Sequence, residues 1–204
     1  TRTVFKNTVS LLYLALFAMG AVSIFTAINS IEALACYARF IVTIIAYFNI
    51  AILLHGRIDL FKILAQVMAA ILLIESIQTL FIFFNQLDSM PLDQLILSLQ
   101  GNTGLKNIFA ASLVVKIPFV MYCIYSFRVW GKVINIIIFI LAILSIFIIN
   151  ARSSYVGLLI ILFIYLLFCS LQYLKEKKGE PLLYRISSIL LPLMAAFFIS
   201  QIVL

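Results

Sequence analysis

Charged residues, histidine and cysteine are scarce in this sequence. Only 10% of its 204 residues are charged, and 66% are hydrophobic. Soluble domains are about one quarter charged and about half apolar, and a soluble fold of this length cannot hide so much apolar surface. The composition therefore excludes a soluble domain and indicates an integral membrane protein.

Metal and disulfide sites have few ligands to draw on. The single histidine, His55, lies in a short polar loop, which excludes a histidine-based metal cluster. Cys36, Cys123 and Cys169 all lie within apolar runs and lack the spacing of metal ligands. We expect no structural disulfide, no metal and no cofactor.

Long apolar runs recur from one end of the chain to the other. A membrane-spanning helix needs about 20 apolar residues, with about 17 to 25 allowed. Seven segments meet this criterion, namely 8–28, 34–54, 63–84, 108–125, 133–149, 155–173 and 186–204. The period-two alternation of an outer-membrane barrel is missing, so helices must satisfy the backbone. We predict an all-α fold, a polytopic transmembrane helical bundle that forms a single domain over 1–204.

The ends of the sequence suggest a longer protein. The chain does not begin with methionine, and it ends inside an apolar run. We therefore expect it to be a fragment.

Lysine and arginine predict the orientation of the spans. Ten of the 14 basic residues flank the spans on one side: Arg2, Lys6, Arg57, Lys62, Arg128, Lys132, Lys175, Lys177, Lys178 and Arg185. Cytoplasmic loops carry such an excess, so we predict a cytoplasmic N-terminus. Membrane orientation also explains the net charge of +7, and we expect membrane lipids rather than nucleic acid as partners.

Four basic residues do not fit this rule: Arg39, Lys106, Lys116 and Arg152. In the predicted topology, all of them lie in the outer half of the membrane or above it. A charge inside a bilayer costs several kcal/mol unless it is paired. Glu75 lies at a depth similar to that of Lys116 in the neighbouring antiparallel span, so we predict a structural ion pair between them. The other three cations then remain unpaired.

The longest loop, 85–107, combines a short apolar pattern with a glycine-bearing corner. Apolar residues at helical spacing predict a short amphipathic helix over about 90–100, which is too short to span and would lie in the outer interface. Glycine allows a ligand to approach the backbone closely, and helix N-termini attract anions. The corner with Asn102, Lys106 and Asn107 is therefore either a ligand site or a capped connector.

The turn 150–154 places Arg152 between two spans. An arginine held in a tight turn can bind phosphate through two parallel hydrogen bonds. Ser153 and Ser154 are natural N-caps for the next helix. The alternative interpretation is capping together with an arginine that reaches into the membrane interface.

Two motifs resemble the O-antigen ligase and O-antigen polymerase family of bacterial polytopic membrane proteins. The first is GNTGLKNIFA at 101–110, which continues to Leu113 and the Pro118-Phe119 pair and is similar to the family's glycine, lysine and asparagine corner. The second is ARSSYVGLL at 151–159, similar to the family's arginine turn that opens the next helix. In the predicted topology both motifs lie outside, where the family works.

The resemblance implies a metal-independent, glycosyltransferase-like enzyme in the bacterial cytoplasmic (inner) membrane. Such proteins transfer a glycan from an undecaprenyl-pyrophosphate carrier to lipid A core or to another glycan. The implied substrate-binding residues are Arg152, Lys106, Arg39, Asn102, Asn107 and Ser153. The family's base is a histidine in an outer loop, whereas His55 is on the predicted cytoplasmic side, so no catalytic residue is assigned here.

Two other classes of function remain open. In a membrane transporter or flippase subunit, Glu75, Lys116 and Arg39 would line a polar pathway for a solute or a lipid-linked intermediate. In a structural bundle, the same residues would only hold helices together.

Overall fold

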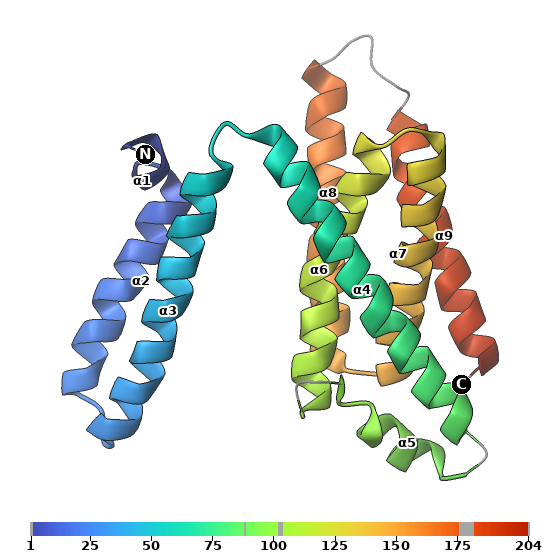
Figure 1. The fold of residues 1–204 in the computed structure, drawn as a ribbon, viewed down its shortest axis with the longest axis horizontal. Helices are drawn as coiled ribbons and strands as arrows, with labels where there is room; N and C mark the ends of the chain where they lie inside the picture. Colours follow the sequence, from blue (N-terminus) through green and yellow to red (C-terminus); the bar gives the residue numbers. More distant parts are fainter. Residues whose placement is uncertain (1, 88, 102–103, 176–181, 204) are drawn as a thin grey trace. The chain divides into compact units, whose positions relative to one another are not determined.

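The computed structural model describes residues 2–87, 89–101, 104–175 and 182–203. These residues form nine helices and no strand (Figure 1). The helices are α1 (Arg2–Phe5), α2 (Thr8–Phe25), α3 (Ser30–Leu54), α4 (Ile58–Gln86), α5 (Leu92–Ser98), α6 (Lys106–Ser126), α7 (Val129–Ile149), α8 (Arg152–Lys175) and α9 (Leu182–Val203). The all-α prediction is confirmed.

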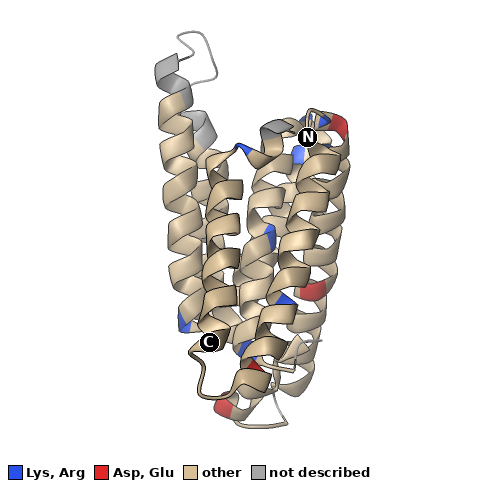
Figure 2. Cartoon of the chain, turned by 90° about the vertical axis from the view of Figure 1, so that its left-hand side faces the viewer, with Lys and Arg blue, Asp and Glu red and all other residues tan. Residues whose placement is uncertain are grey.

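Six of these helices are long and apolar enough to cross a membrane: α2, α3, α4, α6, α7 and α8. They correspond to the first six predicted spans. The seventh predicted span falls on α9, whose described apolar part, Ile186–Ile202, is shorter. Charged residues, which colour the ribbon blue or red in Figure 2, are few along the mostly tan middle of the helices. These features are those of a multi-pass membrane protein.

The chain divides into two compact units, Thr1–Phe61 and Lys62–Leu204. In the first unit, α2 and α3 form a helical hairpin. The rings of Tyr13 and Tyr47 stack at 4.5 Å, and the Tyr37 hydroxyl donates to the Phe17 carbonyl at 3.1 Å. Most side chains of this hairpin are exposed, as expected for helices that face lipid. The predicted single domain stays a prediction.

The core of the second unit lies around α6 and α7. Phe139, Ile143 and Ile146 on α7 are fully buried, as are Leu113 and Val120 on α6. Helices α6 to α9 run side by side around this core (Figure 1). The unit is thus a helical bundle in which α6 and α7 are the most enclosed members.

Helix α4 packs on this bundle through one narrow stripe. Its buried residues recur every three or four positions: Ala65, Ala69, Leu72, Ser76, Thr79 and Phe83. The Ser145 hydroxyl of α7 lies 3.3 Å from the Ser76 carbonyl of α4 and donates to it. This contact fixes α4 against the bundle at that level.

One end of the second unit holds the described residues of the glycine-bearing corner and the turn that contains Arg152. Helix α5 lies there, with the first turns of α6 and α8 and the last turn of α7 (Figure 1). We call this region, which contains residues 101, 104–107 and 150–154, the α5 end. The helix α5 lies inside the range predicted for it, and its location in a membrane interface stays a prediction.

Candidate functional site

A tight corner leads into α6 at the α5 end. Gly101 and Gly104 both have positive φ, 52° and 70°, which favours glycine. A Cβ on Gly101 would lie 2.5 Å from the Phe109 ring, which is itself buried. The corner therefore needs glycine at position 101 so that Phe109 can close against the backbone.

The residue at the N-cap position of α6 makes no side-chain capping bond. The residue before the helix is Leu105, which offers no hydrogen-bond acceptor in its side chain. Lys106 is the first helical residue, and Asn107, the second, is exposed. The first turn of α6 thus presents N–H groups together with a lysine, which is an arrangement that attracts anions. Asn102 lies outside the described residues.

The turn between α7 and α8 is closed by a single left-handed residue. Asn150 has φ 53° and ψ 50°, and its N–H lies 3.2 Å from the Ile146 carbonyl and 3.1 Å from that of Phe147. The Tyr155 hydroxyl donates to Asn150 Oδ1 at 3.0 Å. Because Asn150 reverses the chain so sharply, α8 begins only two residues later, at Arg152.

The predicted capping role of Ser153 and Ser154 is wrong. Both lie inside the first turn of α8, and the position before the helix is Ala151, which has no capping group. Ser153 is exposed, whereas Ser154 is only 2% exposed and its Oγ has no hydrogen-bond partner among the described residues. The Ser154 N–H bonds to the Ala151 carbonyl at 3.0 Å, and Ala151 has no side chain that could cap the N–H groups of Arg152 and Ser153.

Helices α6 and α8 bring Lys106 and Arg152 to the same end of the bundle. A Cβ on Gly157 of α8 would lie 3.0 Å from Val114 of α6, so the helices touch there. Gly157 lies five residues after Arg152, and Val114 lies eight after Lys106. At about 1.5 Å per residue, the two helix starts differ by about 5 Å along the axes. Neither cation forms an ion pair within the described part of the chain.

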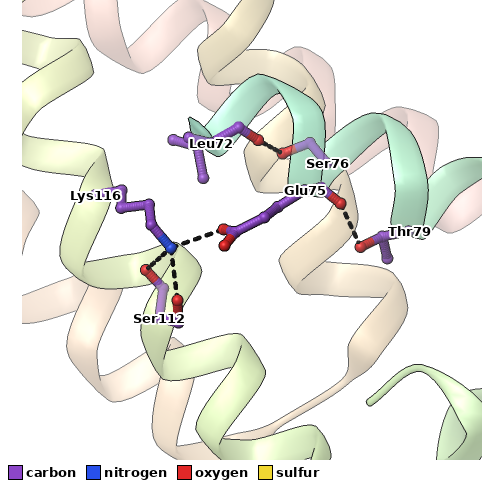
Figure 3. A network of polar contacts seen from close by, with 6 residues as sticks. All are labelled: Leu72, Glu75, Ser76, Thr79, Ser112 and Lys116. Atoms are coloured by element: carbon purple, nitrogen blue, oxygen red, sulfur yellow. Dashed lines mark hydrogen bonds and ion pairs between the residues drawn. The ribbon is translucent and has the colours of Figure 1, made fainter. Parts of the chain in front are cut away.

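The predicted ion pair between Glu75 and Lys116 is present (Figure 3). Lys116 Nζ lies 2.7 Å from Glu75 Oε2, and it also donates to the hydroxyl of Ser112 at 2.5 Å and to its carbonyl at 3.2 Å. The two charged side chains are 12% and 20% exposed. Lys116 is therefore neutralised inside the helix contact and does not add to the cations of the α5 end.

Arg39 belongs to the first unit, where it lies on α3 with an exposed side chain. Its implied role beside Arg152 stays a prediction.

An apolar cavity of about 480 Å³ opens beside α8, which the sequence did not reveal. Its walls come from α7, α8 and α9, with Leu158 at its base and Leu159 and Phe197 at its rim. Because α8 and α9 are apolar on all sides, their sequences do not tell which faces meet and which leave a gap.

Comparison of the chain with family models, with curated proteins and with solved structures gives no match. The family resemblance carried by the two motifs therefore stays a prediction.

Proposed function

We propose that the α5 end binds the pyrophosphate of a lipid-linked glycan and that the chain takes part in transferring that glycan. The supporting observation combines two features of the described residues. Lys106 and Arg152 form no ion pair there, and the residues that precede their helices, Leu105 and Ala151, carry no capping side chain. Each element alone is weakly attractive to an anion, but together they concentrate positive potential at one bundle end. The donor is an undecaprenyl-pyrophosphate-linked glycan, and the acceptor is lipid A core or another glycan.

The proposed reaction exchanges one glycosidic bond for another. The bond between the anomeric carbon and the pyrophosphate oxygen breaks, and its electron pair leaves with the pyrophosphate. An acceptor hydroxyl oxygen bonds to that carbon, and its proton passes to a base. Lys106, Arg152 and the helix starts stabilise the leaving pyrophosphate, which is electrostatic catalysis. We assign this step alone to the α5 end, because the only histidine, His55, lies on the predicted cytoplasmic side.

The ion pair between Glu75 and Lys116 favours this function over transport. A polar pathway needs charged groups that can exchange partners with a solute. Lys116 is instead held by Glu75 and by both oxygens of Ser112. The pair is thus better suited to fixing α4 on α6 than to binding cargo, and a flippase activity becomes an outcome that the experiments below can detect.

Replacement of Arg152 tests the proposal in cells that depend on the complete protein for glycan transfer. Arg152→Ala should lower transfer about 100-fold, as loss of an oxyanion-stabilising donor does. Arg152→Lys should retain part of the activity, because it keeps the charge and loses the planar fork. Arg128→Ala is the matched control, since Arg128 lies between α6 and α7 at the opposite end of the bundle. Normal transfer by Arg152→Ala at normal membrane abundance would refute the proposal.

A further inference from the structure

The apolar cavity and Arg152 share one face of α8. Arg152, Tyr155, Leu159 and Leu162 follow one another at intervals of three and four residues, so they form a single line along the helix. The last three of them line the cavity. Leu162 lies ten residues beyond Arg152, which is about 15 Å along the axis. The lining residues of α8, Tyr155 to Leu162, cover about 10 Å of the helix axis, so the cavity begins about one turn beyond Arg152 and extends into the apolar part of the bundle for about a third of a bilayer core of about 30 Å.

The cavity lining changes from polar to apolar along the α8 axis with increasing distance from Arg152. Ser200 and Gln201, in the last turns of α9, line its outer part beside Tyr155. Leu193, about 12 Å deeper along α9, lines its inner part together with Leu162. Aromatic rings form the middle, where Phe147 lies 5.8 Å from Tyr155 and 5.7 Å from Phe197. The cavity thus changes from polar near the cation to purely aliphatic within the bundle.

The cavity has the size of a small-ligand site and opens beside Arg152 on the same face of α8. The cavity measures about 480 Å³, which suits one hydrocarbon chain, and it lies within the usual range for small-ligand sites. Its rim is open, because Leu159 is 67% exposed, so a chain can enter sideways.

We propose that this cavity holds the hydrocarbon chain of an outer-leaflet lipid whose phosphate lies against Arg152. The assignment rests on the proposed function and adds a place for the carrier's tail, between α8 and α9. Moving a tail from the bilayer into the cavity yields no hydrophobic gain, since the bilayer is equally apolar. The cavity therefore selects by shape, and Arg152 supplies the attraction through its charge and its hydrogen bonds to phosphate.

A photocrosslinking map tests the assignment on the complete protein in lipid nanodiscs. The probe is a farnesyl-length isoprenoid pyrophosphate that carries a diazirine in its chain. Labelling should concentrate on residues 155–162 and 193–201, and excess unmodified farnesyl pyrophosphate should abolish it. Arg152→Ala should reduce it about tenfold, the loss expected for one charged hydrogen-bonded contact.

Two tryptophan variants at one depth provide the matched comparison. Leu159→Trp fills the rim of the cavity and should remove most of the labelling. Ile160→Trp places the same ring on the neighbouring face, outside the cavity, and should leave the labelling unchanged. The labelling pattern of the unsubstituted protein tests the cavity site even if either variant fails to fold.

The labelling experiment gives one result if the cavity site is wrong and another if the proposed function is wrong. Labelling spread evenly around α8, in a protein that still transfers glycan in an Arg152-dependent way, would overturn the cavity site alone. Cavity labelling that is equally strong in Arg152→Ala would overturn the pyrophosphate site at Arg152 and, with it, the proposed function.

Discussion

Neutralising Glu75 leaves the Lys116 ammonium without its counter-charge inside the contact between α4 and α6. Removing one member of a buried pair costs about 3 to 5 kcal/mol. Lys116 keeps its contacts with the hydroxyl and carbonyl of Ser112, so we expect Glu75→Gln to cost about 3 kcal/mol, at the lower end of that range. This loss shifts the unfolding equilibrium more than 100-fold.

The double variant separates an ion pair from two independent polar groups. Lys116→Met leaves the Glu75 carboxylate unpaired and should cost a similar amount, whereas the combination with Glu75→Gln leaves no net charge in the contact. We expect the double variant to lose about 2 kcal/mol less than the sum of the single losses. Unfolding of the reconstituted full-length protein by steric trapping measures all three.

A neighbouring hydroxyl provides the control for this cycle. Thr79 lies one turn from Glu75 and donates to its backbone carbonyl at 2.7 Å. Thr79→Val should cost only about 0.6 kcal/mol, because the contact is local and uncharged. Losses from Glu75→Gln and Lys116→Met that simply add would refute the pairing as a source of stability.

Three further predictions concern the corner, the α4 contact and the topology. Gly101→Ala should destabilise the protein by about 3 kcal/mol, since a Cβ there meets the buried Phe109 ring. Gly104 also has positive φ, but a Cβ there meets no atom, so Gly104→Ala should cost only about 1 kcal/mol. Equal losses in a thermal unfolding assay would contradict the steric argument. Ser145→Ala should cost about 0.6 kcal/mol, because it removes the hydroxyl contact with Ser76. The Ser170 hydroxyl donates to the Leu166 carbonyl within α8, so Ser170→Ala should cost less. Steric trapping compares the free energies of unfolding of the two variants. In a Cys36→Ser background, a membrane-impermeant maleimide should label Ser153→Cys in intact cells and Arg128→Cys only after permeabilisation, and the reverse pattern would place the α5 end inside the cytoplasm.

The sequence predicted best those features of the fold that depend on residues close together in the chain. Apolar runs located the helices of the membrane spans, but not their ends. Helix α3 begins at Ser30 rather than at 34, because the Asn29 side chain accepts the Glu32 N–H at 3.3 Å and caps the helix. Likewise, α4 extends to Ile58, since Asp59 and Lys62 continue the helix beyond its apolar part. A criterion based on hydropathy misses such polar helical ends.

The ion pair was predictable because two neighbouring antiparallel spans place their polar residues at comparable depths. The start of α8 was not predictable from the sequence. It depends on the left-handed conformation of Asn150, which lets the helix begin at Arg152 so that Ser153 is already helical. The division into two units and the cavity beside α8 depend on which faces pack together. Helices that are apolar on all sides carry no periodic pattern that specifies those faces.

The most direct test of the account is to identify the product that the complete protein releases. The purified protein would be reconstituted into vesicles with an undecaprenyl-pyrophosphate-linked glycan and an acceptor, and the free lipid pyrophosphate would be quantified. The account predicts that one lipid pyrophosphate appears for each glycan transferred and that Arg152→Ala suppresses both. Movement of the intact lipid-linked glycan across the bilayer without release of pyrophosphate would contradict the account and support a flippase.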